Sequence, residues 1–218
     1  MIRLVSWDVD GTLFSYSRLF IALLRLSPRK LERRGLIGMA SQMRDVSRFH
    51  QKVEAQRRCD DSRVDIEELR SFASIQVEEK AALEAALRIV EPRAAVLEVL
   101  KAFRIQGVPQ VVLSDFECEY KLKALGLTGY FVRTYSCHAL GYWKPSPLPF
   151  EHVQRDFGIQ PDEHLHIGDR NNADGWGCAR NGCSFVNVRS LTKLTNRGSL
   201  RAGNVQSYLC ETYRQAGL

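Results

Sequence analysis

The sequence lacks any apolar run long enough to cross a membrane. Its longest run, LFIALL, covers residues 19–24, whereas a membrane-spanning helix needs about 18 or more apolar residues. The first residues also lack the pattern of a secretion signal, because a strand-like start leads directly into Asp8. These two absences predict a protein that is neither inserted into a membrane nor secreted.

Paired cysteines are missing as well. None of the six cysteines forms a C-x-x-C pair, which argues against a zinc knuckle and indicates free thiols in a reducing cytoplasm. Biased segments are absent, and with 44% hydrophobic residues the chain of 218 residues can bury a sizeable core. The net charge of +6 suits an anionic partner, although charge alone does not separate nucleic acid from a small phosphate ester.

Apolar segments that alternate with helical patterns predict an α/β fold. The strand-like segments are residues 2–7, 109–115, 130–137, 163–169 and 183–188. The segments between them with helical spacing of apolar residues are 91–107, 118–127 and 146–158. This alternation indicates a Rossmann-like, doubly wound parallel sheet, in which ligands bind at the carboxyl ends of the strands.

Residues 16–90 interrupt this alternation. Apolar residues recur every three or four positions between 36 and 53, and residues 78–90 have strong helix propensity. We therefore predict an α/β core made of residues 1–15 and 91–218, with a small helical domain made of residues 16–90. Residues 16–58 carry eleven basic and three acidic side chains; a solvated surface with internal pairing explains this bias better than a substrate-attracting one.

Polar residues follow several of the predicted strands. Asp8 and Asp10 follow the first strand in DVDGT, and Ser114 ends the second. Lys144 lies in GYWKPSP, and a further pair of carboxylates, Asp169 and Asp174, occurs in HIGDRNNAD. Carboxylates, a lysine and hydroxyl groups together suit a hard divalent cation that bridges to a phosphate group.

The order of these motifs is D-x-D-G-T, then an apolar residue and Ser, then Lys-Pro, then G-D-x4-D. From Ile2 to about Val188, this order resembles the haloacid dehalogenase-like hydrolase superfamily, and the block from Lys144 to Asp169 is similar to its phosphatase-type members. The resemblance implies a Mg²⁺-dependent phosphatase that acts on a small phosphorylated metabolite. It also implies that residues 16–90 are the family's helical cap.

The resemblance further implies roles for the carboxylates. Asp8 would be the nucleophile that forms an aspartyl-phosphate intermediate. Asp10 would protonate the leaving oxygen and then act as the base that activates water. Mg²⁺ would bind the Asp8 carboxylate, the Asp10 main-chain carbonyl and Asp169.

The remaining motif residues would bind phosphate or support the lysine. Thr12 and Ser114 would hydrogen-bond the phosphoryl oxygens. Lys144 would neutralise both the nucleophile and the charge that develops during phosphoryl transfer. Asp174 would hold Lys144 or a metal-bound water.

Three other functions need comparison. A dehalogenase of the same fold has no leaving oxygen to protonate, so Asp10 argues against that reaction. A phosphomutase shares every motif, and the core alone leaves it open. A catalytically idle module that binds nucleic acid or another protein is disfavoured, because the motif set is complete and the basic residues of the insert are not interleaved with aromatic ones.

Four residues near the motifs have plainer interpretations. Asp115, directly after Ser114, is expected to face solvent. Trp143 is explained by packing at least as well as by stacking on a leaving group. His164 and His166 are expected to be core histidines rather than metal ligands, because Mg²⁺ prefers oxygen.

Overall fold

The computed structural model describes residues 1–26, 51–58, 63–65, 80–81 and 83–195. Most of the helical pattern predicted between 36 and 53 therefore lies outside the described residues, as does the beginning of the one at 78–90. Within the described residues, 51–57, 80–81 and 83–87 are helical, and residues 88–90 are not. Within the described ranges, no helix combines the length and hydrophobicity that crossing a membrane requires.

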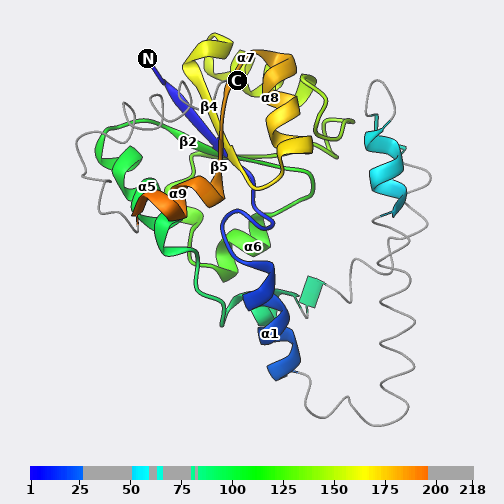
Figure 1. Ribbon diagram of the computed structural model, residues 1–218, viewed down its shortest axis with the longest axis vertical. Coiled ribbons are helices and arrows are strands. Elements are labelled where there is room, and N and C mark those ends of the chain that lie inside the picture. Colours follow the sequence, from blue (N-terminus) through cyan, green and yellow to red (C-terminus); the bar gives the residue numbers. More distant parts are fainter. Residues whose placement is uncertain (27–50, 59–62, 66–79, 82, 196–218) are drawn as a thin grey trace.

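A parallel sheet of five strands forms the centre of the fold (Figure 1). The strands are β1 (Leu4–Trp7), β2 (Gln110–Ser114), β3 (Arg133–Ser136), β4 (His164–Gly168) and β5 (Ser184–Asn187). Their order is β3-β2-β1-β4-β5, and Trp7 lies opposite both Val112 and Ile167. All five predicted strand segments and the predicted α/β class are confirmed. From β1 the chain adds β2 and β3 on one side of the sheet and then β4 and β5 on the other. Ligands bind in folds of this kind at the switch point, which lies between β1 and β4.

Helices cover both faces of the sheet. The helices are α1 (Tyr16–Leu26), α5 (Ala94–Ile105), α6 (Glu119–Ala124), α7 (Leu148–Phe157), α8 (Trp176–Asn181) and α9 (Val188–Thr195). Three short turns complete the fold: η1 (Thr128–Tyr130), η2 (Pro161–Glu163) and the π-turn η3 (Asn171–Gly175). Helices α5, α6 and α9 contribute to the core on one face, whereas α7 and α8 contribute to the core on the other.

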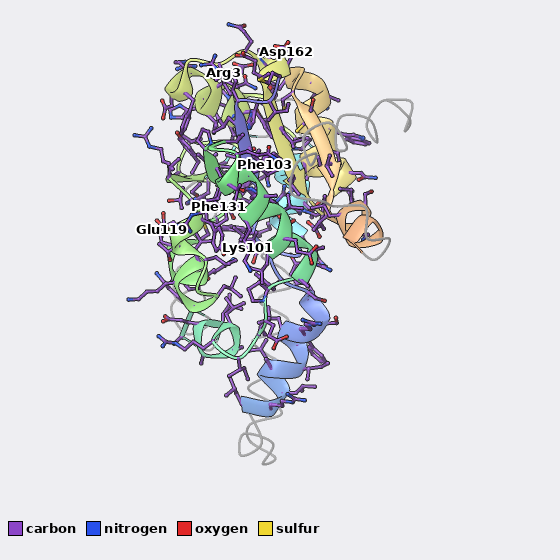
Figure 2. All side chains as sticks on the ribbon, turned by 90° about the vertical axis from the view of Figure 1, so that its left-hand side faces the viewer. Arg3, Lys101, Phe103, Glu119, Phe131 and Asp162 are labelled. Carbon is purple, nitrogen blue, oxygen red and sulfur yellow. The ribbon has the colours of Figure 1, made fainter. Side chains whose placement is uncertain are left out.

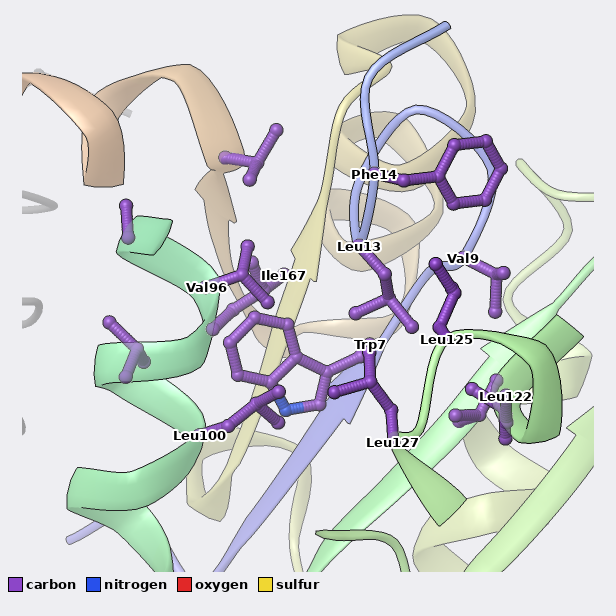
Figure 3. Packing of buried hydrophobic residues seen from close by; sticks show 14 of the residues in the cluster. Trp7, Val9, Leu13, Phe14, Val96, Leu100, Leu122, Leu125, Leu127 and Ile167 are labelled. Atoms are coloured by element: carbon purple, nitrogen blue, oxygen red, sulfur yellow. The ribbon is translucent and has the colours of Figure 1, made fainter. Parts of the chain in front are cut away.

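Alternation along β1 sends neighbouring side chains to opposite faces, as a pleated strand requires. Val5 and Trp7 belong to the core that α5 covers, and Leu4 belongs to the core under α7. The Trp7 ring is fully buried and packs among apolar side chains that include Val96 and Leu100 of α5 (Figure 3). The next residue is Asp8, so the first motif carboxylate begins from a rigid, close-packed strand.

The turn after β1 needs a glycine. Gly11 has a φ of +83°, and a Cβ there would lie 2.3 Å from Asp169 Oδ2. Both the left-handed backbone and the close approach exclude other residues, so Gly11 lets the first and fourth motifs touch. Figure 2 shows Arg3 and Asp162 at the other end of the sheet, far from α1.

Candidate active site

Lys144 lies at the centre of the buried polar residues. Its Nζ donates to Asp8 Oδ1 at 2.7 Å, to Asp174 Oδ1 at 2.6 Å and to the Leu113 carbonyl at 3.2 Å. Neither the lysine nor Asp174 is accessible to solvent, and Asp8 is 3% exposed. The structure therefore brings together one residue from each of three sequence motifs in a single hydrogen-bonded cluster.

The charges in this cluster shift one another's pKa values. Burial alone would lower the pKa of Lys144, but Asp174 and Asp8 outweigh it and hold that pKa well above its usual value. Burial would raise the pKa of Asp174, yet Lys144 and the hydrogen bond from His166 lower it. Burial raises the pKa of Asp8, with Asp174 adding to the effect and Lys144 opposing it. Lys144 is thus a fixed cation between two carboxylates.

The second motif carboxylate has a different partner. Asp10 Oδ2 accepts from Lys121 Nζ of α6 at 2.5 Å, and the Asp10 side chain is 28% exposed whereas that of Lys121 is 6% exposed. Burial would lower the pKa of Lys121, but Asp10 outweighs it and raises that pKa. Lys121 was missed in the sequence, because a lysine on an amphipathic helix 111 residues away carries no local signal of this contact.

The two hydroxyl residues predicted to bind phosphate lie at the same edge. Thr12 Oγ1 donates to Asp8 Oδ2 at 3.2 Å, and Thr12 is fully buried. Ser114 is 1% exposed and ends β2, the strand beside β1. Both hydroxyls therefore belong to the carboxyl edge of the sheet, where Asp8 begins.

Three carboxylates could hold a metal ion. One ligand oxygen from each of Asp8, Asp169 and Asp174 lies within 4.8 Å of the others. Asp174 already accepts from Lys144 and His166 through Oδ1 and from the Arg170 N–H through Oδ2. Asp169 Oδ1, in contrast, is buried and has no hydrogen-bond partner in the described part of the chain.

The electrostatics of Asp169 fit a divalent cation. Burial, together with the charges of Asp8 and Asp174, raises the pKa of Asp169 to about 6. A cation such as Mg²⁺ prefers carboxylate oxygens and would favour the ionised form of a carboxylate beside it. The residues present therefore fit Mg²⁺, with Asp8 and Asp169 as ligands and Asp174 committed to Lys144.

Asp115 corrects one expectation. It does not face solvent: it is 4% exposed, and its Oδ2 accepts from Arg57 Nη2 at 2.5 Å and from Arg170 Nη2 at 2.7 Å. Burial would raise the pKa of Asp115, but the charges of Arg57, Lys144 and Arg170 lower it to about 2. Local sequence gives no sign that two distant arginines converge on this carboxylate.

A chain of hydrogen bonds leads to Asp174 under α7. Gln154 Nε2 lies 3.2 Å from His164 Nδ1, and Ser6 Oγ lies 2.7 Å from both His164 Nε2 and His166 Nδ1. Since an amide nitrogen can only donate, His164 carries its proton on Nε2, and the Ser6 hydroxyl donates to His166. His166 Nε2–H then donates to Asp174 Oδ1 at 3.2 Å.

Both histidines and Trp143 are buried. His164 and His166 lie in β4 with no exposed surface, and burial lowers the pKa of His164 to about 3. The fully buried Trp143 packs with Val53 and donates from Nε1 to Gln56 Oε1 at 2.7 Å. Trp143 is therefore a packing residue in this structure, and His166 is the histidine that contacts the site.

The fold and the site together define an α/β enzyme core with an acidic centre at the carboxyl edge of a parallel sheet. Residues 2–182 match the model of the family described as haloacid dehalogenase-like hydrolase. The chain belongs to this family of hydrolases. The resemblance drawn from the order of the motifs is thereby confirmed.

Two curated relatives are phosphatases. Phosphoglycolate phosphatase of Neisseria gonorrhoeae is 31% identical over 114 residues, which are 49% of this chain and 48% of the relative. Glyceraldehyde 3-phosphate phosphatase of Methanopyrus kandleri is 33% identical over 69 residues, which are 32% of this chain and 30% of the relative. The chain thus spans half or less of the length of these relatives.

Solved structures share the fold. A phosphatase of this family from Thermococcus onnurineus aligns with a TM-score of 0.63 at 21% identity, covering 89% of this chain and 97% of that one. L-2-haloacid dehalogenase from Xanthobacter autotrophicus aligns with a TM-score of 0.56 at 21% identity, covering 85% and 76%. At such identities these likenesses establish architecture only, because one fold hosts several reactions.

Proposed function

We propose that the chain is a Mg²⁺-dependent phosphatase that hydrolyses a small phosphorylated metabolite through an aspartyl-phosphate intermediate. The observation that carries this proposal is the buried Lys144 ammonium, 2.7 Å from Asp8 and 2.6 Å from Asp174. A fixed cation beside a carboxylate suits a nucleophile that must stay ionised next to an anionic phosphoryl group.

In the proposed reaction, an Asp8 oxygen bonds to phosphorus while the bond from phosphorus to the leaving oxygen breaks. Asp10 gives its proton to that oxygen. A water oxygen then bonds to phosphorus and its proton passes to Asp10, while the bond from phosphorus to Asp8 breaks. Inorganic phosphate leaves, and the Asp8 carboxylate is restored.

Asp8, Asp169 and the Asp10 carbonyl would hold Mg²⁺, and Thr12 and Ser114 would bind phosphoryl oxygens. When bound, Mg²⁺ supplies positive charge that attracts the phosphoryl group and favours ionised carboxylates. The partnerless Asp169 oxygen supports this assignment within the described residues.

The Asp10 side chain supports a phosphatase rather than a dehalogenase. Asp10 is more exposed than Asp8 and shares a short hydrogen bond with Lys121. A side chain in that position could give a proton to a leaving oxygen and take one from a water. A halide leaves without a proton, so a dehalogenase does not need such an acid.

The relatives' names guide the choice of substrates. Phosphoglycolate and glyceraldehyde 3-phosphate are small phosphate monoesters, and we propose substrates of this chemical class. Residues 16–90 would form the cap that closes over the site and selects the leaving group. A cytoplasmic location suits such metabolites.

The test is phosphate release from a panel that contains 2-phosphoglycolate, glyceraldehyde 3-phosphate and p-nitrophenyl phosphate, with Mg²⁺ and with EDTA. We expect Mg²⁺-dependent release without any added sugar bisphosphate. A strict requirement for a bisphosphate, with transfer rather than release of phosphate, would instead identify a phosphomutase.

Two variants control the panel. Asp8→Asn should abolish release, because an amide cannot replace the carboxylate nucleophile. Asp162→Asn makes the same chemical change at an exposed residue at the far end of the sheet and should keep wild-type activity. Wild-type turnover in Asp8→Asn would exclude the covalent mechanism.

A further inference from the structure

Both main-chain polar groups of Lys144 are held by one ion pair. The Lys144 N–H donates to Asp115 Oδ1 at 3.3 Å, and Arg57 Nη1 donates to the Lys144 carbonyl at 2.6 Å. Arg57 Nη2 closes the ring by donating to Asp115 Oδ2 at 2.5 Å. The side chains of Arg57 and Asp115 are only 7% and 6% exposed, so water does not compete strongly for these bonds.

The ring joins segments that are distant in the sequence. Arg57 belongs to the helical residues 51–57 (cyan in Figure 1), within the predicted cap. Asp115 directly follows Ser114 of β2, and Lys144 lies in the loop between β3 and α7. The helical segment thus reaches the second and third motifs at the same point.

Further contacts fix this segment against the loop. Gln56 Oε1 accepts from Trp143 Nε1 at 2.7 Å, and the Arg57 guanidinium lies 5.6 Å from the centre of the Trp143 ring. Val53 is 1% exposed and packs with Trp143 and Phe116. The helical segment that carries Arg57 is therefore itself packed against the loop of Lys144, so the position of Arg57 is fixed by several contacts.

We propose that Arg57 is a positioning residue that, together with Asp115, clamps the main chain of Lys144 and so sets the place of its ammonium group against Asp8. This inference rests on the proposed function, in which Lys144 neutralises the nucleophile. The lysine side chain has four flexible carbons, so its tip is fixed only when the main chain and the ammonium group are both held. Arg57 and Asp115 hold the first, and Asp8 and Asp174 hold the second.

The geometry separates this role from a purely structural one. Asp115 Oδ2 also accepts from Arg170 at 2.7 Å, so loss of Arg57 leaves that carboxylate with a cation. Loss of Arg57 also removes its contacts with Trp143 and Glu54, but its hydrogen bond to the Lys144 carbonyl is the one that holds the main chain of the lysine. The expected loss is therefore larger in catalysis than in folding stability.

The experiment compares Arg57→Gln and Arg57→Lys with Arg58→Gln, a matched control at the neighbouring, exposed arginine. The assay follows hydrolysis of p-nitrophenyl phosphate in the presence of Mg²⁺ by the wild type and each variant. For Arg57→Gln we expect kcat to fall about 100-fold with KM nearly unchanged, because displacing a catalytic group by about 1 Å costs a factor of this size. Arg57→Lys keeps the charge and should fall between Arg57→Gln and the wild type, whereas Arg58→Gln should match the wild type.

Hydrogen exchange gives a readout that does not need turnover. In Arg57→Gln, and to a smaller degree in Arg57→Lys, peptides that contain Trp143 and Lys144 should exchange faster, while peptides of β1 and β4 should not change. Equal kcat in Arg57→Gln and Arg58→Gln, a rise in KM alone, or unchanged exchange at Lys144 would overturn the inference. A wild type that hydrolyses no phosphate ester would refute the proposed function, and the exchange data would still test the clamp.

Discussion

Asp8 and Asp10 lie two positions apart in the sequence, yet their surroundings differ in almost every respect. Asp8 faces a lysine with no exposed surface, which a second buried carboxylate also holds. Asp10 faces Lys121 of α6, and its own side chain is 28% exposed. The first pair is fixed before any substrate arrives, whereas the second can exchange partners with water or a leaving group. Fixed charge suits a nucleophile, and access suits a residue that moves protons.

The largest test of this comparison is the loss of each carboxylate. Asp8→Asn should reduce turnover by about 10⁴-fold or more, because it removes the carboxylate that we propose as the nucleophile. Asp10→Asn should cost about 10² to 10⁴, the range for a general acid or base. The Asp10→Asn loss should also be smaller with p-nitrophenyl phosphate than with an alkyl phosphate, because nitrophenolate leaves without a proton. Equal losses with both substrates would contradict the assignment of Asp10.

The two lysines sharpen the comparison through stability. Lys144→Met leaves Asp8 and Asp174 buried without their shared cation, which should cost about 3–5 kcal/mol in the free energy of unfolding. Lys121→Met should cost about 1 kcal/mol or less, because the partly exposed Asp10 can be hydrated. Urea denaturation with unchanged m-values measures both. Similar costs would show that the two pairs are not as different as their exposure indicates.

The sequence predicted much of the fold but little of this contrast. The five strands follow from short apolar runs, and the motif residues on the Asp8 side follow from their order along the chain. The order of the motifs does not identify Lys121, Arg57 or Arg170, because each contacts a residue that is distant in the sequence and comes close only in the folded protein. Asp115 illustrates the reason. In the sequence, a single carboxylate after a strand indicates only a solvent-facing strand end, and Arg57, 58 residues away, contacts it only in the folded protein.

Metal binding should depend on pH through Asp169, on the Asp8 side of the site. The pKa of Asp169 is raised from 3.8 to about 6, so without metal the folded protein favours the protonated carboxyl group. Protonated Asp169 therefore adds to the free energy of unfolding fully below about pH 4, and this contribution is lost as the pH rises through about 6.

Since Mg²⁺ binds the ionised form, the stabilisation that it gives should increase over the same range. At a concentration 100 times Kd, Mg²⁺ should stabilise the protein by about 2.7 kcal/mol near neutral pH and by about 1.4 kcal/mol less near pH 5. Thermal unfolding with Mg²⁺ and with EDTA at several pH values checks this, and Asp169→Asn should remove the pH dependence of the stabilisation by Mg²⁺. A gain from Mg²⁺ that did not vary with pH would exclude Asp169 as a ligand.

The smallest expected effect on turnover concerns the chain of hydrogen bonds that leads through Ser6 and the two histidines to Asp174. Ser6 Oγ accepts from His164 Nε2 and donates to His166 Nδ1, both at 2.7 Å. Ser6→Ala leaves one buried donor and one buried acceptor unsatisfied, which should cost about 1–3 kcal/mol. Turnover should change little, because Asp174 still accepts from Lys144 and from the Arg170 N–H. Ser17→Ala removes an exposed hydroxyl whose hydrogen bond, to Ser15 Oγ, is also exposed to water, and it should change the free energy of unfolding little. Equal stabilities of the two variants would show that the buried chain through Ser6 does not stabilise the protein.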